Sequence, residues 1–517
     1  MDRGRRLFAS ALVSSGPRPV GVLITIFLTP FMLNHLGQEV YGIWALTGSL
    51  LAYTGLLALG LNSAVTYRVP QLLTRKDDEG VNTVLSTVFA FYCVGAVLAL
   101  AFGLLLTWKL PVWFHVAHPL KTPVRIVVAL LAVGITVQIP LSVYKGLLGS
   151  LERWDILAGV NVASQLLRAA CIVVAFGLGF GIVTLAGISV LADLGATMVV
   201  VPFAYRLYPK LAIDRHHLAW PMLPGLMNYS LNTLMYTASQ VIVLQSGKIL
   251  IGLLYGPAAV TVFVIPFTLL IMLSQAVHQA AQPLKPATTM LDSEGRRLMI
   301  TRIYVLATKY SLMIAAPSSV LFMFWGENIL KVWVGGEFSA QSASVLSVMT
   351  IPQMLRAVNT SGFVVLSGLG QARFFGRVTL VQALISVVLG YVLAELGGLG
   401  LLGVALGISI PELIVSGFVV PTYMVRTLDL KWGELRMSMF QALTAAIPFT
   451  VCFLVVSRFF TSETRVELLL VLALSALPLA LGIWFLGLTQ EERGHFKGYL
   501  YLHRGGPSQD DEAGAGS

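Results

Sequence analysis

The chain has 517 residues, of which 56% are apolar and 11% are charged, and its formal net charge is +10. Soluble domains carry about 25% charged residues, so a water-soluble globular fold is excluded and the lipid bilayer is the expected solvent. The basic residues are scattered through short loops without aromatic interleaving. This pattern argues against a nucleic-acid partner.

Fourteen apolar stretches each reach the roughly 20 residues that a helix needs to cross about 30 Å of hydrocarbon. The sequence therefore predicts an all-α polytopic membrane protein with 14 transmembrane helices. The expected spans are residues 11–34, 41–66, 83–107, 123–148, 156–178, 181–205, 223–246, 250–281, 303–325, 341–367, 375–395, 398–424, 438–460 and 466–488.

Lysine and arginine are concentrated on one side of this arrangement. Residues 68–76, 206–215, 285–302 and 426–436 form loops on the same side as the N-terminus, and each holds at least three of these cations. The positive-inside rule then places both termini in the cytoplasm. The stretch 491–517 is rich in Gly, Asp and Ser near its end, and we expect a disordered cytoplasmic tail.

Residue types recur at an offset of about 220 positions. The members of the first set are Gly187, Ile188, Ser189, Asp193, Pro202 and Arg206, and those of the second are Gly407, Ile408, Ser409, Glu412, Pro421 and Arg426. Six spans separate the two sets, so the halves are parallel, as in transporters whose lobes rock around a central site. We expect an N-lobe (1–210), a C-lobe (211–430) and two appended spans (431–490); the alternative is chance similarity among Gly/Val/Ile-rich helices.

Four cations lie inside the apolar stretches: Arg18, Arg168, Lys309 and Arg356. Charge in hydrocarbon is costly and normally faces a cavity or a partner. Arg168 and Arg356 lie about 18 and 16 Å from the cytoplasmic ends of their spans, whereas Arg18 and Lys309 lie at about 9–10 Å and are shallow enough to reach the headgroups. A cationic cavity for a phosphate-bearing ligand is the functional interpretation.

Two carboxylates occupy mid-depth positions, one in each predicted half: Asp193 and Glu412. Desolvation disfavours the charged form of such a group, and nearby cations favour it, so both are candidates for ion coupling. The alternative is that each neutralises a neighbouring arginine, with Arg168 and Asp193 forming a structural ion pair.

A polar face runs along the seventh and eighth spans. Asn228, Asn232, Tyr236 and either Ser239 or Gln240 recur at helical spacing, and Gln275, His278, Gln279 and Gln282 follow. The candidate sugar-binding residues are Asn228, Asn232, Tyr236, Gln240, Gln275 and Gln279. Hydrogen bonding between helices is the alternative.

No P-loop, metal-ligand cluster or hydrolase motif is present. We therefore expect no enzyme activity, no catalytic residue, no metal and no cofactor. Cys93, Cys171 and Cys452 all fall in apolar stretches and are expected to be small hydrophobic residues without disulfides.

Several short runs carry a family resemblance: Leu36-Gly37-Gln38-Glu39-Val40-Tyr41-Gly42-Ile43-Trp44, Leu59-Gly60-Leu61-Asn62-Ser63-Ala64, Thr74-Arg75-Lys76-Asp77-Asp78, Ile249-Leu250-Ile251-Gly252, Tyr255-Gly256-Pro257 and Pro283. With these runs the chain resembles the polysaccharide-biosynthesis flippases of the multidrug/oligosaccharidyl-lipid/polysaccharide superfamily over roughly residues 5–490. The resemblance implies a MATE-like fold of two six-helix lobes plus two helices, with a cationic lumen and alternating access.

The implied substrate is an oligosaccharide on an undecaprenyl pyrophosphate carrier, moved to the outer leaflet of a bacterial inner membrane. The implied partners are this lipid-linked glycan and the bilayer, with a polysaccharide polymerase and a chain-length regulator as further candidates. Gly247 stands where many relatives carry an acid, which argues against cation coupling through the seventh span.

Two related functions and one from another class are the alternatives. Lipid II flipping and drug or cation antiport occur among related families, and the surplus of buried cations argues against antiport. A scaffold for a synthase complex would leave the buried charges unexplained.

Overall fold

A computed structural model describes residues 17–336, 339–371, 373–459 and 464–494, apart from a few side chains within these ranges. In this part of the chain every regular element is helical, and 11 helices are long and apolar enough to cross a membrane. The chain is therefore an all-helical, multi-span membrane protein, as the sequence predicted.

The helices of the first half run from α2 to α7 and end at a loop that leads to α8. Their bounds are α2 (Pro17–Leu51), α3 (Leu56–Thr74), α4 (Asp78–Trp113), α5 (Lys121–Ser150), α6 (Trp154–Gly177) and α7 (Ile182–Leu207), with short 3-10 turns η1 (His118–Leu120) and η2 (Trp220–Met222).

The second half begins with the longest helix and ends with a helical pair at the edge of the molecule. Its elements are α8 (Leu223–Ala281), α9 (Leu284–Ser293), α10 (Arg297–Val334), α11 (Ser339–Gly368), α12 (Arg373–Tyr391), α13 (Gly400–Ile414), α14 (Val420–Thr427), α15 (Trp432–Ala445), α16 (Ile447–Val456) and α17 (Arg465–Gly482), with π-helical segments η4 (Val392–Leu396), η5 (Val415–Val419) and η6 (Ile483–Gly487).

Glycine kinks divide α2 and α8. Gly37 has φ 75° and ψ 171°, and Gly256 has φ 80° and ψ 176°. Only glycine adopts this conformation without steric cost. The 11 candidate helices are fewer than the 14 predicted stretches. α2 continues through Gly37 between the first two stretches, and α8 runs from the seventh stretch into the eighth, with its kink at Gly256 inside the predicted 250–281. α11 is long but polar, and the predicted stretch 41–66 is interrupted between the end of α2 at Leu51 and the start of α3 at Leu56.

The helices of the two halves correspond at a constant spacing in the sequence. α10 begins 219 residues after α4, and α12 begins 219 residues after α6. Residues with positive φ follow the same spacing: Gly37 with Gly256, Lys76 with Gly295, and Gly179 with Gly398. The helix boundaries and turns therefore repeat together with the residue types.

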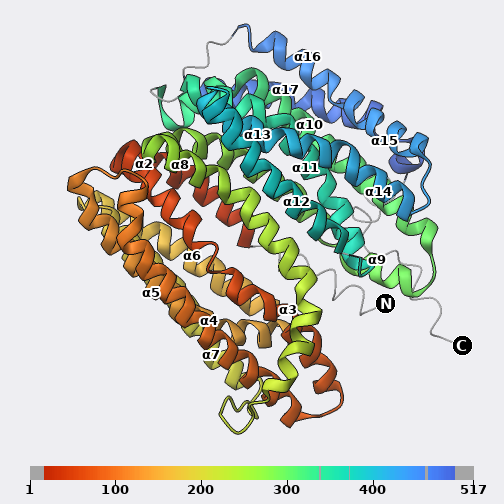
Figure 1. The fold of residues 1–517 in the computed structure, drawn as a ribbon. Coiled ribbons are helices and arrows are strands. Elements are labelled where there is room, and N and C mark those ends of the chain that lie inside the picture. Colours follow the sequence, from red (N-terminus) through yellow and green to blue (C-terminus); the bar gives the residue numbers. More distant parts are fainter. Residues whose placement is uncertain (1–16, 337–338, 372, 460–463, 495–517) are drawn as a thin grey trace, which may run out of the picture.

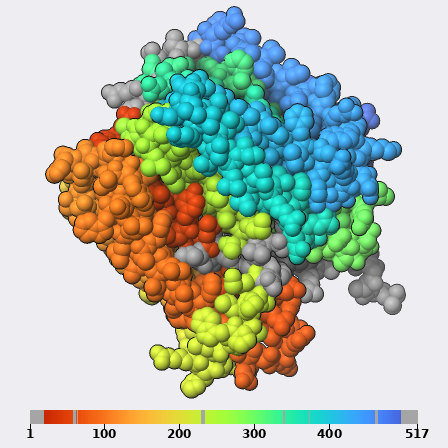
Figure 2. Space-filling model, viewed as in Figure 1, coloured from red at the N-terminus to blue at the C-terminus, as the bar shows by residue number. Residues whose placement is uncertain are grey.

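Three hydrophobic clusters show how the halves meet. One cluster contains residues of both halves, among them Ile43 and Phe114 with Phe263 and Ile408. The other two large clusters are separate: one around Val84 and Tyr144 in the first half, the other around Tyr304 and Phe375 in the second. We call the end with the shared cluster the joined end and the opposite end the divided end. Figure 1 shows the two bundles meeting near the labels α2 and α8 and diverging toward α3 and α9, and Figure 2 shows a recess between their surfaces.

α8 links the two halves at the divided end. Leu226 near its start belongs to the first-half cluster, whereas Tyr236 packs against the second-half cluster. The preceding loop is held on the first half, because Asn82 donates from Nδ2 to the Lys210 carbonyl (2.9 Å) and accepts at Oδ1 from the Ala212 amide (3.1 Å). The long green helix that crosses between the bundles in Figure 1 is this connection.

Candidate functional site

Two cavities adjoin between the bundles. The first-half cavity has a volume of about 740 Å³ and the second-half cavity about 1140 Å³. Ile271, Gln275 and His278 line both. The second segment of α8 is therefore a wall that the two adjoining cavities share.

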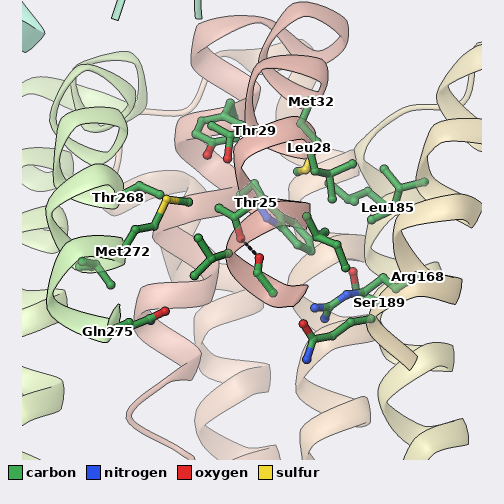
Figure 3. A pocket seen from close by; sticks show the side chains of 18 of the residues that line it. Thr25, Leu28, Thr29, Met32, Arg168, Leu185, Ser189, Thr268, Met272 and Gln275 are labelled. Atoms are coloured by element: carbon green, nitrogen blue, oxygen red, sulfur yellow. Dashed lines mark hydrogen bonds between the residues drawn. The ribbon is translucent and has the colours of Figure 1, made fainter. Parts of the chain in front are cut away.

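Helices α2, α6, α7 and α8 build the first-half cavity. Figure 3 shows Thr268, Met272 and Gln275 on one side, Arg168 and Ser189 on the other, and Thr25 and Thr29 between them. The lining is mixed, with apolar residues such as Leu28, Met32 and Leu185 between the polar groups. Such a surface contacts apolar groups and offers a few hydrogen bonds.

Arg168 lines this cavity from α6 and has a carboxylate partner. Its Nη1 lies 3.6 Å from Asp193 Oδ1 on α7, and both side chains are partly exposed (36% and 51%). The ion pair considered as an alternative for Arg168 is thus present. Because the guanidinium has five N–H groups, one such contact leaves donors for a ligand in the cavity.

Arg356 occupies the deeper wall of the second-half cavity, on α11. Its Nη2 donates to Gln240 Oε1, and its Nη1 lies 3.5 Å from Glu412 Oε2. Glu412 is 3% exposed and also accepts hydrogen bonds from Gln382 (2.7 Å) and from Ser416 (2.6 Å) on the π-helical segment η5. The buried carboxylate is therefore well satisfied, as a buried charge requires.

Polar atoms without partners face the same space as Arg356. The Gln353 amide nitrogen and the Ser367 hydroxyl are buried and have no hydrogen-bond partner among the described residues. Arg356 Nη1 also makes no hydrogen bond there, although it lies in ion-pair contact with Glu412. Gln353 is only 2% exposed. Unsatisfied buried donors cost about 1–3 kcal/mol each, so their convergence on one cavity is typical of a binding site whose ligand completes the bonding.

Aromatic rings form the side of this cavity toward the divided end. Tyr236 stacks on Phe363 with ring centroids 3.9 Å apart, and Phe374 stacks on Tyr423 at 3.5 Å. All four residues line the cavity. Stacked rings beside amide and hydroxyl groups provide both an apolar face and hydrogen bonds, the two contacts that a sugar ring needs.

The candidate sugar-binding residues have different surroundings. Tyr236 and Gln240 line the second-half cavity, and Gln275 lines both cavities. Gln279 lines neither, and both of its amide atoms are buried without a hydrogen-bond partner among the described residues. The side chains of Asn228 and Asn232, and that of Arg18, lie outside the described residues, as do the first residues of the predicted span 11–34 and most of the predicted tail.

Lys309 lies away from both cavities. Its ammonium is 2% exposed and donates to Glu492 Oε2 at 2.7 Å, and Tyr310 donates to the other oxygen of Glu492 at 3.3 Å. The structure does not bring Lys309 together with Arg168 and Arg356. The contact of Lys309 with Glu492 instead holds α10 against the segment that follows η6.

Two further cations line the second-half cavity that the sequence did not indicate: Lys285 on α9 and Arg373 at the start of α12. Along the chain they fall in short loops, where cations are ordinary. The only sequence feature that could have pointed to either residue was Gly370, a turn-favouring residue shortly before Arg373. His278 aside, the charged residues that line the two cavities in the described part of the chain are four cations and one carboxylate. The cations are Arg168, Lys285, Arg356 and Arg373, and the carboxylate is Glu412.

Comparison with known proteins agrees with this architecture. A family model described as "Polysaccharide biosynthesis protein" matches residues 39–343, more than half of the chain. The chain is 21% identical over 441 residues to "Uncharacterized membrane protein EpsK" of Bacillus subtilis (strain 168), covering 84% of this chain and 86% of EpsK. It is 20% identical over 403 residues to "Putative O-antigen transporter" of Shigella flexneri, covering 76% and 91%.

Solved structures share the fold. The lipid II flippase MurJ in an inward closed conformation aligns with a TM-score of 0.72 and 11% identity, over 92% of this chain and 98% of that chain. An inward-facing multidrug resistance MATE family transporter of the MOP superfamily aligns with a TM-score of 0.66 and 17% identity over 81% and 98%. At these identities the similarity concerns the fold. The chain belongs to the polysaccharide biosynthesis protein family and has the MATE- and MurJ-like fold of the MOP superfamily.

Proposed function

We propose that the protein is a flippase that moves an oligosaccharide linked to undecaprenyl pyrophosphate across the bacterial inner membrane by alternating access. The observation that carries the proposal is the pair of adjoining cavities between the two halves, lined by four cations and one carboxylate among the described residues. A diphosphate supplies the negative charge that this surplus favours, and arginine forks match its oxygens. The relative named as an O-antigen transporter supports a lipid-linked glycan as substrate.

In the proposed topology the chain crosses the membrane 14 times, in two parallel lobes of six helices with two helices added at the C-terminus. A straight α8 of 59 residues would be about 88 Å long, against about 30 Å of hydrocarbon, which supports two crossings separated at Gly256. α2 divides in the same way at Gly37. The divided end faces the cytoplasm, because the loops around Arg75, Lys76, Arg296 and Arg297 lie there and carry many cations. This arrangement is an inward-facing state.

In this state the diphosphate takes the place of acidic side chains around Arg168 and Arg356, while the sugars contact the amides and aromatic rings of the second-half cavity. Closing the divided end and opening the joined end exposes the same groups to the other side. The sign of the cavity charge disfavours a cation antiporter. Lipid II flipping uses the same chemistry of recognition, so it is the second candidate, and the MurJ-like fold is the observation that favours it.

Replacement of the cavity arginines tests the proposal. We expect Arg356→Ala or Arg168→Ala to lower the amount of lipid-linked glycan on the outer leaflet by about 10- to 100-fold, since a hydrogen bond to a charged group contributes about 1.5–3 kcal/mol. The lysine variants keep the charge but lose the fork, so an intermediate loss is expected. The measurement is mass spectrometry of glycan labelled by a membrane-impermeant reagent in intact cells.

The matched control is Arg153→Ala, which breaks an exposed pair with Asp155 that lines neither cavity. It should leave export unchanged. Normal export by both cavity alanine variants at normal expression would reject the lumen as the substrate path. Labelling of lipid II instead of the longer glycan would select the second candidate.

The role of the two carboxylates needs its own test. If Glu412 or Asp193 couples transport to an ion, Glu412→Gln or Asp193→Asn should reduce export strongly and remove its dependence on external pH. Glu412 is the stronger candidate, because it is buried on the cavity wall whereas Asp193 is half exposed. Export that keeps its rate and pH profile in both variants would mean that the acids only neutralise the arginines.

A further inference from the structure

Two cations converge at the edge of the second-half cavity toward the divided end. Lys285 comes from the first turn of α9, and Arg373 begins α12. Both line the cavity and both are exposed. Neither has a carboxylate within ion-pair distance among the described residues, in contrast to Arg168 and Arg356, which each lie within 3.6 Å of an acid.

Close packing of α9 on the end of α11 brings the first of these cations to the cavity. A Cβ on Gly368 would lie 2.9 Å from the Lys285 carbonyl oxygen and 2.9 Å from Thr288 Cβ. The Thr289 hydroxyl donates to the Gly368 carbonyl at 3.0 Å. The missing side chain of Gly368 therefore allows the α9 backbone, and Lys285 with it, to lie directly on the last turn of α11.

The turn after α11 brings the second cation to the same edge. Gly370 has φ 71°, and the Gln371 amide donates back to the Leu366 carbonyl at 2.8 Å. This closes α11 and starts α12 at Arg373. The Ser367 hydroxyl, which has no partner among the described residues, lines the cavity one turn before this point.

We infer that Lys285 and Arg373, with the Ser367 hydroxyl, form a capture site for the diphosphate of a polyprenyl-linked substrate before it reaches the paired arginines. This inference rests on the proposed function. Uncompensated cations in contact with water attract a diphosphate at little desolvation cost, whereas a carboxylate already offsets part of the charge of Arg168 and of Arg356. Two phosphates match two cations, one a point charge and one a planar fork.

Binding of unglycosylated undecaprenyl diphosphate to the purified full chain in nanodiscs of phosphatidylcholine tests the inference. We expect Lys285→Gln with Arg373→Gln to weaken binding about tenfold and to flatten its dependence on salt, because exposed contacts are weak and screened. The control is Arg297→Gln with Arg377→Gln, which removes the same charge from the neighbouring helices α10 and α12 at exposed residues that do not line the cavities. It should bind like the wild type.

Further arms separate the substrate from other anions. Undecaprenyl monophosphate should bind the wild type more weakly than the diphosphate, and the double variant should remove most of that difference. Phosphatidylglycerol at the same concentration should not displace the diphosphate. Equal displacement, or equal weakening by the control pair, would overturn the inference in favour of a general attraction of anionic lipid.

Transport kinetics distinguish capture from the central role of the arginines. The Lys285/Arg373 variant should raise the KM for lipid-linked glycan and leave kcat nearly unchanged, whereas Arg356→Ala should lower kcat. Unchanged KM and diphosphate affinity in the double variant, with Arg356→Ala still defective, would reject the capture site and leave the proposed flippase standing. If neither variant loses transport, both the capture site and the proposed flippase function would be contradicted.

Discussion

We expect Gly42→Ala to lower transport by about tenfold or more by disfavouring closure of the joined end. Gly42 lies in α2, shortly after the kink at Gly37, and faces α8 just after its kink at Gly256. A Cβ at this position would overlap the Pro257 carbonyl oxygen and lie 2.7 Å from the Pro257 carbonyl carbon and 3.0 Å from Thr261 Oγ1. These are mostly backbone atoms, so no rotamer change relieves the contact.

The consequence follows from the way the two kinks pack together. Gln38 donates to the Ala258 carbonyl at 3.2 Å, and the Thr261 hydroxyl donates to the Gln38 carbonyl at 2.7 Å. Overpacking costs about 1–3 kcal/mol, and 1.4 kcal/mol is a factor of about ten in an equilibrium. The population with a closed joined end should therefore fall by about tenfold or more, which slows an alternating-access cycle by a similar factor.

Cross-linking between the halves measures this shift directly. Gln38→Cys and Ala258→Cys, in a chain whose Cys93, Cys171 and Cys452 are replaced by serine, should cross-link efficiently in the otherwise unchanged protein and poorly when Gly42→Ala is added. Gly48→Ala is the matched control, because it lies in the same helix and a Cβ there meets nothing within 4 Å. Equal cross-linking in the Gly42 and Gly48 variants would show that the joined end tolerates the methyl group.

The second large effect is expected from Glu492, the partner of Lys309. Glu492→Gln should lower the free energy of unfolding by about 3 kcal/mol, since removing one partner of a buried ion pair leaves an uncompensated charge. Lys309 is 2% exposed and the Glu492 side chain is 14% exposed. Thermal unfolding of the purified protein followed by size-exclusion chromatography measures the loss.

Two variants control this prediction. Lys309→Met with Glu492→Gln removes the buried charge together with its partner and should recover much of the stability. Glu491→Gln removes an exposed contact with Arg302, and the side chains of Glu491 and Arg302 are 62% and 57% exposed. This variant should lower the free energy of unfolding by less than about 1 kcal/mol. An equal loss in the Glu491 and Glu492 variants would show that the Lys309 pair contributes no more than a surface pair.

The same pair predicts a pH dependence with a definite sign. Burial raises the pKa of the Glu492 carboxyl, but hydrogen bonds from Lys309 and from the Thr489 amide outweigh it and lower the pKa below its ordinary value. A group with a lowered folded-state pKa stabilises the fold above its unfolded-state pKa, and this contribution is lost as the pH falls through the folded-state value. The stability gap between wild type and Glu492→Gln should therefore narrow in acid.

The sequence alone was sufficient for the class of the protein and for the approximate position of most of its helices. Burial of about 20 apolar residues per crossing is a local requirement, so composition along the chain predicts where apolar helices lie, but it did not place the kink at Gly256 or the break between α2 and α3. Recurrence of Asp193 as Glu412 at a spacing of 219 indicated the repeat that the helix boundaries also show. Mid-membrane charge is costly wherever it occurs, which is why Arg168 and Arg356 could be selected as cavity residues without a structure.

Only the tertiary structure decided which charges share a space. Lys309 is a cation inside an apolar stretch, as Arg168 is, yet Lys309 forms an ion pair in the helix packing with Glu492, 183 residues away. Lys285 and Arg373 look like ordinary loop cations in the sequence. The close contact of α9 with Gly368 brings Lys285 to the cavity, and the turn at Gly370 brings Arg373 there. The physical reason is that a charge is costly to bury anywhere along an apolar helix, and the sequence alone reveals such positions. The partner of that charge depends on contacts between helices that are distant in the chain, and only the tertiary structure reveals it.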